Sequence, residues 1–93
     1  MPHLYYAANF DPEVHRLLSA YERGDTVSAE LFKEKIVTII QKILTAPDIS
    51  PAGTEEWNII AGLIETYDSN SAAENALLAV YGAPFSMRFA LSQ

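Results

Sequence analysis

The sequence of residues 31–44 is LFKEKIVTIIQKIL, and this stretch decides the fold class. Polar residues interrupt its apolar residues at the spacing of a helix, and the pattern is long enough to outweigh the poor helix propensity of the β-branched run from Val37 to Ile40. Pro47 ends the pattern, and Ser28 is a suitable N-cap. We therefore predict a helix over residues 28–46 as the central and most buried element of the protein.

A second helix is predicted on the N-terminal side of this stretch. Asp11-Pro12-Glu13 combines an N-cap, a proline at the first helical position and an acid in the first turn, and Gly24 supplies a stop signal. Val14 and Leu17 begin a row of apolar residues at helical spacing, which would form the buried face of the helix. These signals predict a helix over residues 12–23.

Two further helices are predicted on the C-terminal side. Thr54 is a candidate N-cap for a helix over residues 54–68, which carries Trp57 and other apolar residues on one face. Ser71 is followed three residues later by Glu74, which is the spacing of a capping box. This box predicts a short helix over residues 71–81, closed by Gly82.

The two ends of the chain, residues 1–10 and 83–93, show a different pattern. Phe85, Met87, Phe89 and Leu91 alternate with more polar or smaller residues at the period of a strand, and residues 4–10 do so more weakly. We expect extended termini that pair as strands with each other or with a second chain; the alternative is a tail whose aromatic rings fill gaps between helices. The whole prediction is a mostly α, four-helix single domain over residues 1–93.

The charge of the chain is unevenly distributed. The sequence has a formal net charge of −6. The following acids lie between Ile43 and Met87, a range that contains neither Lys nor Arg: Asp48, Glu55, Glu56, Glu65, Asp68 and Glu74. A surface of one sign repels nucleic acid and attracts basic protein surfaces. We therefore expect a protein partner with a basic surface, and no direct contact with nucleic acid.

The motifs of common enzymes and cofactor sites are missing from the sequence. It has no cysteine, and its two histidines, His3 and His15, are far apart in the sequence. It contains no nucleophile elbow, zinc-protease motif or phosphate-binding loop. No apolar run reaches the length of a membrane span, and the first residues lack the basic start of a signal peptide. We expect a cytoplasmic protein that is not an enzyme, with no cofactor, no metal site and no membrane contact.

The acids of residues 54–68 are the candidate binding residues. Glu55, Glu56, Glu65 and Asp68 are predicted to form an acidic docking face. The alternative is a set of solvated capping roles, because the first turn of a helix favours negative charge and Asp68 lies in a predicted turn.

Aromatic and long apolar residues at the two ends are the candidates for self-association. Tyr5 and Tyr6 lack a helical periodicity that would place them in a core. Together with Phe85, Met87 and Phe89 they predict a self-association surface and a homo-oligomer, because aromatic residues are enriched at interface hot spots.

Residues 53–68, GTEEWNIIAGLIETYD, resemble the segment of HigA-type antitoxins in which a Gly-Thr turn leads into a helix ending in Leu-Ile-Glu-x-Tyr-acid. The helix-turn-helix that follows this segment in that family has no counterpart here, because residues 70–93 contain a single basic residue, Arg88. The resemblance therefore implies a small protein that neutralises another protein. Phage-encoded inhibitors of nucleic-acid enzymes are similar in size and acidity, which suggests a phage or mobile element.

Two classes of function follow. The first is an acidic protein–protein interaction module: an inhibitor, an antitoxin-like factor or an adaptor. The alternative is a small-molecule sensor with a pocket between helices or at a dimer interface. A sensor of anions would need a cation near its pocket, and Arg88 is the only one that the second half offers.

Overall fold

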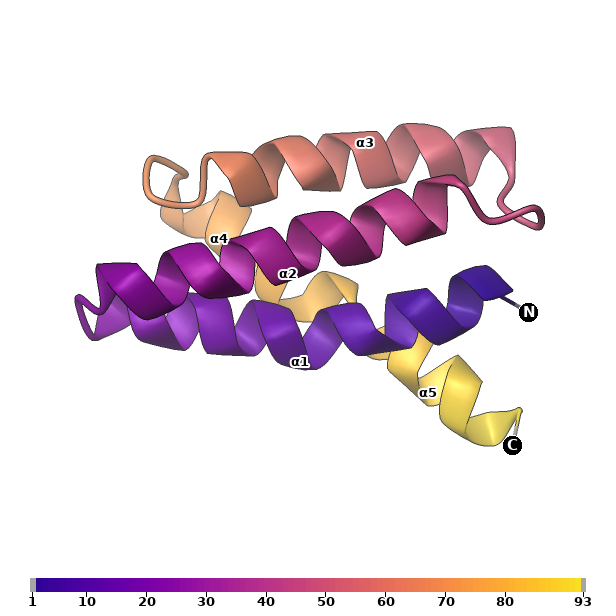
Figure 1. The fold of residues 1–93 in the computed structure, drawn as a ribbon, viewed down its shortest axis with the longest axis horizontal. Coiled ribbons are helices and arrows are strands. Elements are labelled where there is room, and N and C mark those ends of the chain that lie inside the picture. Colours follow the sequence, from indigo (N-terminus) through magenta and orange to yellow (C-terminus); the bar gives the residue numbers. More distant parts are fainter. Residues whose placement is uncertain (1, 93) are drawn as a thin grey trace.

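Five helices make up residues 2–92, the part of the chain that the computed structural model describes (Figure 1). They are α1 (Pro2–Glu22), α2 (Thr26–Leu44), α3 (Pro51–Glu65), α4 (Ala72–Tyr81) and α5 (Ala83–Leu91). In Figure 1, α1, α2 and α3 run side by side in alternating directions, α4 crosses behind them, and α5 continues past α1 on the side away from α3. The predicted mostly α fold is confirmed.

Of the N-caps predicted for α2, α3 and α4, that of α4 is confirmed and the other two lie at other residues. The capping box of Ser71 and Glu74 forms as predicted, with both reciprocal hydrogen bonds. The cap of α2 is Asp25, whose side chain accepts the backbone N–H of Ser28, so Ser28 is inside the helix. The cap of α3 is Ser50 rather than Thr54, because Pro51 takes the first helical position.

The prediction of an extended N-terminal segment was wrong for residues 2–10. They form the first half of α1, which runs through Pro12 without a break. Pro12 has no N–H to donate to the Ala8 carbonyl, and that carbonyl accepts the Ser86 hydroxyl at 3.2 Å instead. The spacing of the buried residues is helical from the start of the chain: Leu4, Ala7, Phe10, Val14 and Leu17.

The prediction of an extended C-terminal segment was wrong for residues 83–91, which form α5. A period of two also fits a helix with apolar residues on two sides, because residues two apart differ by about 200° around the helix axis. Phe85 packs inward against Trp57, and Phe89 packs against Tyr5, whereas Met87 and Leu91 are exposed. Residues 1 and 93, which the predicted segments included, lie outside the described residues.

The centre of the fold is α1 rather than the predicted helix 28–46. α1 contacts α2, α4 and α5, and its buried side chains extend from Leu4 to Ala20. α2 buries Ile36, Ile40 and Ile43, but its Leu31 side chain is 57% exposed. The broad apolar surface of α2 is therefore only partly used in the core.

An aromatic cluster of Phe10, Trp57, Tyr81 and Phe85 joins α1, α3, α4 and α5. The Trp57 ring centroid lies 5.1 Å from those of Phe10 and Tyr81, both in edge-to-face geometry, and 5.4 Å from that of Phe85. Such pairs add about 0.5–1.5 kcal/mol each beyond the burial of their area. The cluster fixes the junction of α4 and α5 against the middle of α1.

Gly82 provides a test of this junction, because a Cβ added there would lie 2.9 Å from the Asp11 Cα. We expect Gly82→Ala to destabilise the protein by about 1–3 kcal/mol, since backbone must move to admit the methyl group. Gly62→Ala is the matched control. Its Cβ meets nothing within 4 Å, and the same change should stabilise α3 by about 0.5–1 kcal/mol. Urea unfolding followed by circular dichroism measures both, and equal effects of the two variants would contradict the proposed close packing.

Candidate functional site

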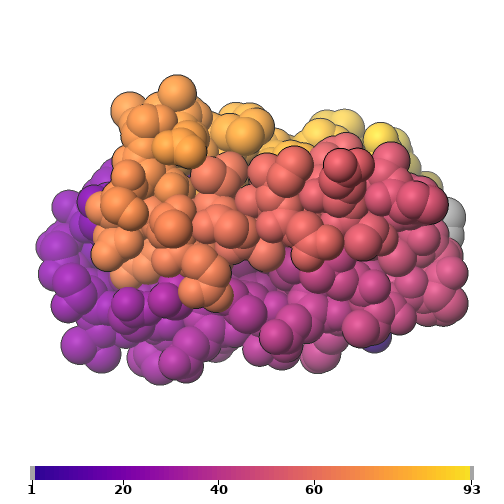
Figure 2. All heavy atoms as spheres, turned by 90° about the horizontal axis from the view of Figure 1, so that it is seen from above, coloured from indigo at the N-terminus to yellow at the C-terminus, as the bar shows by residue number. Residues whose placement is uncertain are grey.

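The outward side of α3 carries the first of the predicted binding residues. Trp57, Ile60 and Ile64 face the core, and Glu55 is exposed on the opposite side of the helix. Among the described residues Glu55 makes no side-chain hydrogen bond or ion pair. One turn further along, Ile59 is 61% exposed. Figure 2 looks onto this side of the molecule, where α3 lies between α2 and the segment that leads into α4.

Glu56 is oriented toward the end of α4. The Tyr81 hydroxyl donates a hydrogen bond of 2.6 Å to Glu56 Oε1. Burial, and then the neighbouring carboxylate, raise the pKa of Tyr81 well above its ordinary value. The phenol therefore stays protonated and donates its hydrogen to the Glu56 carboxylate.

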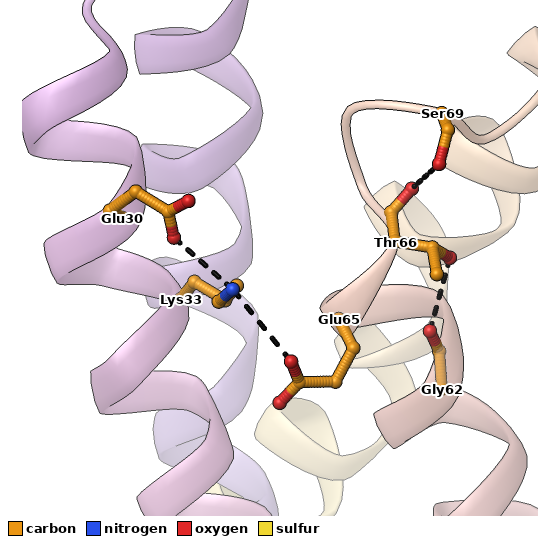
Figure 3. Close-up of polar contacts among 6 residues, drawn as sticks. All are labelled: Glu30, Lys33, Gly62, Glu65, Thr66 and Ser69. Atoms are coloured by element: carbon orange, nitrogen blue, oxygen red, sulfur yellow. Dashed lines mark hydrogen bonds and ion pairs between the residues drawn. The ribbon is translucent and has the colours of Figure 1, made fainter.

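Glu65 points to the other side of α3, toward α2. Figure 3 shows Lys33 between two carboxylates: its Nζ lies 3.2 Å from Glu30 Oε2 and 3.7 Å from Glu65 Oε2. The hydrogen bond with Glu30 is the main reason why the pKa of Lys33 is raised, and Glu65 adds to it. One cation shared by two carboxylates leaves a net negative charge at this place.

Asp68 lies in the turn that follows α3. Its backbone carbonyl accepts the hydroxyl of Tyr21 at 3.1 Å, which ties the turn to α1. The Thr66 hydroxyl donates to the Gly62 carbonyl, and the Ser69 hydroxyl donates to the Thr66 carbonyl (Figure 3). The turn is therefore held in place, while the Asp68 side chain remains exposed.

The four predicted residues form an acidic strip along α3 rather than one cluster. Glu55 and Glu56 are neighbours in its second turn, and Glu65 and Asp68 lie near its other end, about 15 Å away along the axis. Glu56 and Glu65 leave α3 on opposite sides, with Glu55 between them. Across the described residues, Lys33 is the one cation that forms an ion pair with the strip. The role of the acidic strip in binding stays a prediction.

The residues predicted for self-association are largely engaged within the chain. The Tyr5 ring lies 5.7 Å from that of Phe89, and Phe85 belongs to the aromatic cluster. Lys42 Nζ lies 5.9 Å from the Tyr6 ring centroid. Met87 and Tyr5 remain exposed, at 65% and 53%, although the Tyr5 ring has these neighbours. These contacts make the terminal aromatic residues part of the fold, and self-association itself stays a prediction.

A polar cavity at the start of α1 was missed by sequence reasoning. Asp48 Oδ1 accepts the backbone N–H of His3 at 3.2 Å, and Asp48 Oδ2 lies 2.6 Å from His3 Nδ1. Asp48 thus caps α1 from a distant loop, as carboxylates do at helix N-termini. The adjoining cavity has a volume of about 380 Å³ and is lined by both residues, by Trp57 and Tyr81, and by Arg88. No local sequence signal links these residues.

A wider groove of about 580 Å³ lies on α2, away from the acidic strip. Leu31, Phe32 and Ile39 line it, together with Glu13 of α1. Glu13 Oε1 accepts a hydrogen bond from Arg16, but its Oε2 is buried without a hydrogen-bond partner. Sequence reasoning missed this groove because it assigned the apolar side chains of α2 to the core.

Comparisons with protein-family models, with curated proteins and with solved structures find no match for this chain. The resemblance of residues 53–68 to HigA-type antitoxins therefore stays a prediction. In the structure, Gly53 and Thr54 lie within α3 and not in a turn before it. The helices between residues 2 and 92 are too short or too polar to cross a bilayer. Those residues also contain no group of three or more side chains arranged to hold a metal ion.

The Asp48 cap predicts a pH-dependent contribution to stability. Desolvation raises the pKa of Asp48, but the hydrogen bonds from His3 outweigh it and lower the pKa below its ordinary value. A carboxyl whose pKa is lower in the folded state stabilises that state above its unfolded pKa of about 3.9, and the contribution is lost as the pH falls through the folded pKa. We expect Asp48→Ala to lower the melting temperature by a few degrees at neutral pH, and the difference from the parent protein to vanish in acid.

Asp68→Ala is the matched control for this prediction, because the Asp68 carboxylate caps no helix. Thermal unfolding of the three proteins followed by circular dichroism across the acidic range measures the effect. A difference between Asp48→Ala and the parent protein that persists unchanged in strong acid would contradict the cap.

Proposed function

We propose that the protein is an acidic protein–protein interaction module that docks the acidic strip on a basic surface of a partner protein. The observation that carries the proposal is the uncompensated charge of the strip. Lys33 is shared with Glu30, Glu56 is bonded to a neutral phenol, and Glu55 has no side-chain partner among the described residues. A negative field of this kind speeds the encounter with a basic partner and selects against acidic ones.

The surroundings of the strip support docking. Ile59 is 61% exposed and lies one turn from Glu55 on the outward side of α3. An exposed apolar side chain with charged residues around it matches the usual interface, which has an apolar centre and a polar rim. The partner is expected to bring a shallow apolar surface for Ile59 and basic side chains on either side of it.

Within this proposal the chain is a non-enzymatic inhibitor, antitoxin-like factor or adaptor that works in the cytoplasm. The antitoxin-like alternative, and with it an origin in a phage or mobile element, draws support from the resemblance of residues 53–68. The same charge that favours a basic protein disfavours direct binding to nucleic acid. Self-association into a homo-oligomer is part of the proposal.

Reversal of two charges tests whether the acidic strip binds the partner. Glu55→Lys with Asp68→Lys changes two carboxylates of the strip that make no side-chain ion pair among the described residues. The control is Glu22→Lys with Glu34→Lys, which makes the same change in net charge on exposed positions of α1 and α2. The parent protein and both variants are used to capture a partner from native-host lysate, and the partner is identified by mass spectrometry. We expect the control variant to capture the same partner as the parent protein. We expect the strip variant to lose it, and high salt to release it from the parent protein.

Circular dichroism melts of both double variants show whether they fold equally well. Capture of the same basic protein at full strength by the strip variant would contradict the proposal, because the strip would then be a solubilising surface only.

A second candidate function, binding of a small molecule, is favoured by the cavity beside Arg88. Arg88 makes no ion pair within the described residues, and its guanidinium carbon lies 5.7 Å from the Phe85 ring centroid. The cavity of about 380 Å³ combines this cation with the aromatic side chains of Trp57 and Tyr81. Its two carboxylates, Asp48 and Glu56, already accept hydrogen bonds from His3 and from the Tyr81 hydroxyl. This combination suits a small aromatic carboxylate, whose charge would pair with the guanidinium.

Trp57 is the only tryptophan of the chain and lines this cavity, so its fluorescence reports on binding. We expect a saturable change on titration with benzoate, and its loss in Arg88→Gln. Arg16→Gln is the control, because Arg16 lies outside the cavity. A flat titration of the parent protein, or an unchanged one in Arg88→Gln, would contradict this candidate.

A further inference from the structure

The outer side of α4 and α5 exposes a row of apolar side chains. Leu77 and Val80 of α4 are 46% and 63% exposed, and Met87 and Leu91 of α5 are 65% and 81% exposed. The inward side chain Leu78 is fully buried, so the two helices have apolar residues on both sides. We call the exposed row Ala73, Leu77, Val80, Pro84, Met87 and Leu91 the apolar stripe.

The apolar stripe has the spacing of a helix–helix seam. Its members follow one another at alternating steps of four and three residues, as the a and d positions of a coiled coil do. The phase is kept across the junction, because Gly82 has right-handed helical backbone angles, with φ −79° and ψ −21°. The apolar stripe therefore continues from α4 into α5, and within the described chain no helix packs on it.

The charges on α4 and α5 indicate what covers the stripe. The two helices contain one acid, Glu74, and one base, Arg88, so this side is neutral in a chain with a net charge of −6. Two copies of an acidic chain repel each other through their other surfaces, and a two-fold interface places the same patch of each copy against itself. A second copy can approach the neutral outer side of α4 and α5 without electrostatic repulsion between like charges.

We propose that the apolar stripe is the interface of a homodimer in which α4 and α5 pack antiparallel against the same helices of a second copy. Glu74 and Arg88 are equidistant from Tyr81 in the sequence, and their helix positions flank the same edge of the stripe. An antiparallel two-fold arrangement centred near Val80 therefore brings Glu74 of each copy to Arg88 of the other. In the single chain the Arg88 guanidinium lies over the Phe85 ring, so the pairing requires this exposed side chain to turn outward on dimerisation. The single acid and the single base of this side are then both paired.

The inference rests on the self-association put forward under the proposed function, but it is independent of the basic partner. It assigns self-association to the outer side of α4 and α5 in place of the terminal aromatic residues, whose rings have neighbours within the chain. The acidic strip is on α3 and stays uncovered, so the dimer presents two strips.

Sedimentation equilibrium over a range of protein concentrations tests the interface. We expect the parent protein to sediment as a dimer of the 10.3 kDa chain. Val80→Glu should weaken the dimer at least about 100-fold, because two carboxylates would be buried near the two-fold axis. Val27→Glu is the control: Val27 is 73% exposed at the start of α2, and the same change should leave the dimer intact.

The outcomes separate the two proposals. A parent protein that stays monomeric at every concentration would overturn self-association altogether, whereas a dimer that survives Val80→Glu would overturn this surface only. Arg88→Glu and Glu74→Arg test the antiparallel register: each should weaken the dimer, and their combination should restore it. Thermal melts test whether Glu74→Arg, which loses the capping box, remains folded. A combined variant as weak as the single variants would overturn the register.

Discussion

The fold depends on a proline in the middle of its central helix. Pro12 removes one backbone hydrogen bond from α1, and an interior proline costs a helix about 3 kcal/mol. Tertiary contacts gather at the same place: the Ser86 hydroxyl satisfies the Ala8 carbonyl, and the backbone of Gly82 packs on Asp11 so closely that a side chain would not fit. The junction of α4 and α5 thus packs on α1 at the position where the proline removes a backbone hydrogen bond. The stability of α1 therefore depends on contacts with α4 and α5.

The same junction orients both surfaces to which we assign binding. Tyr81 and Phe85 lie on either side of Gly82, and both pack on Trp57, so α3 is held to the junction through the aromatic cluster. Tyr81 also binds Glu56, which fixes the first part of the acidic strip. Because Phe85 must face inward, Met87 and Leu91 are left on the outside of α5. The orientation of the acidic strip on α3 and the exposure of the apolar stripe on α4 and α5 therefore both follow from the packing at this junction.

Local signals predicted the fold, and distant contacts account for what they missed. The periodicity of residues 28–46 and the capping box at Ser71 act within a few residues, and both gave helices at the expected places. The helix of residues 2–10 depends on Asp48 and Ser86, which are remote in sequence, so Asp11-Pro12 looked like a helix start. The charges of the strip were evident from composition, but the opposite directions of Glu56 and Glu65 follow from Tyr81 and Lys33. The exposure of Leu77 and Val80 depends on which side of α4 meets α1 and α3, which the sequence pattern does not specify.

Charge and apolar surface are segregated on this small protein, and that segregation makes two kinds of association compatible. In our proposals two acidic chains associate at a side with no net charge, the outer side of α4 and α5, and a basic partner docks where negative charge is concentrated, on α3. The proposed dimer would carry twice the net charge of one chain and would leave both acidic strips uncovered. When a partner offers two basic sites within reach, the second contact becomes intramolecular, so weak individual docking can give tight overall binding. A shallow strip with a single exposed isoleucine is sufficient for such a bivalent arrangement, whereas a monomer would need a larger interface to reach the same affinity.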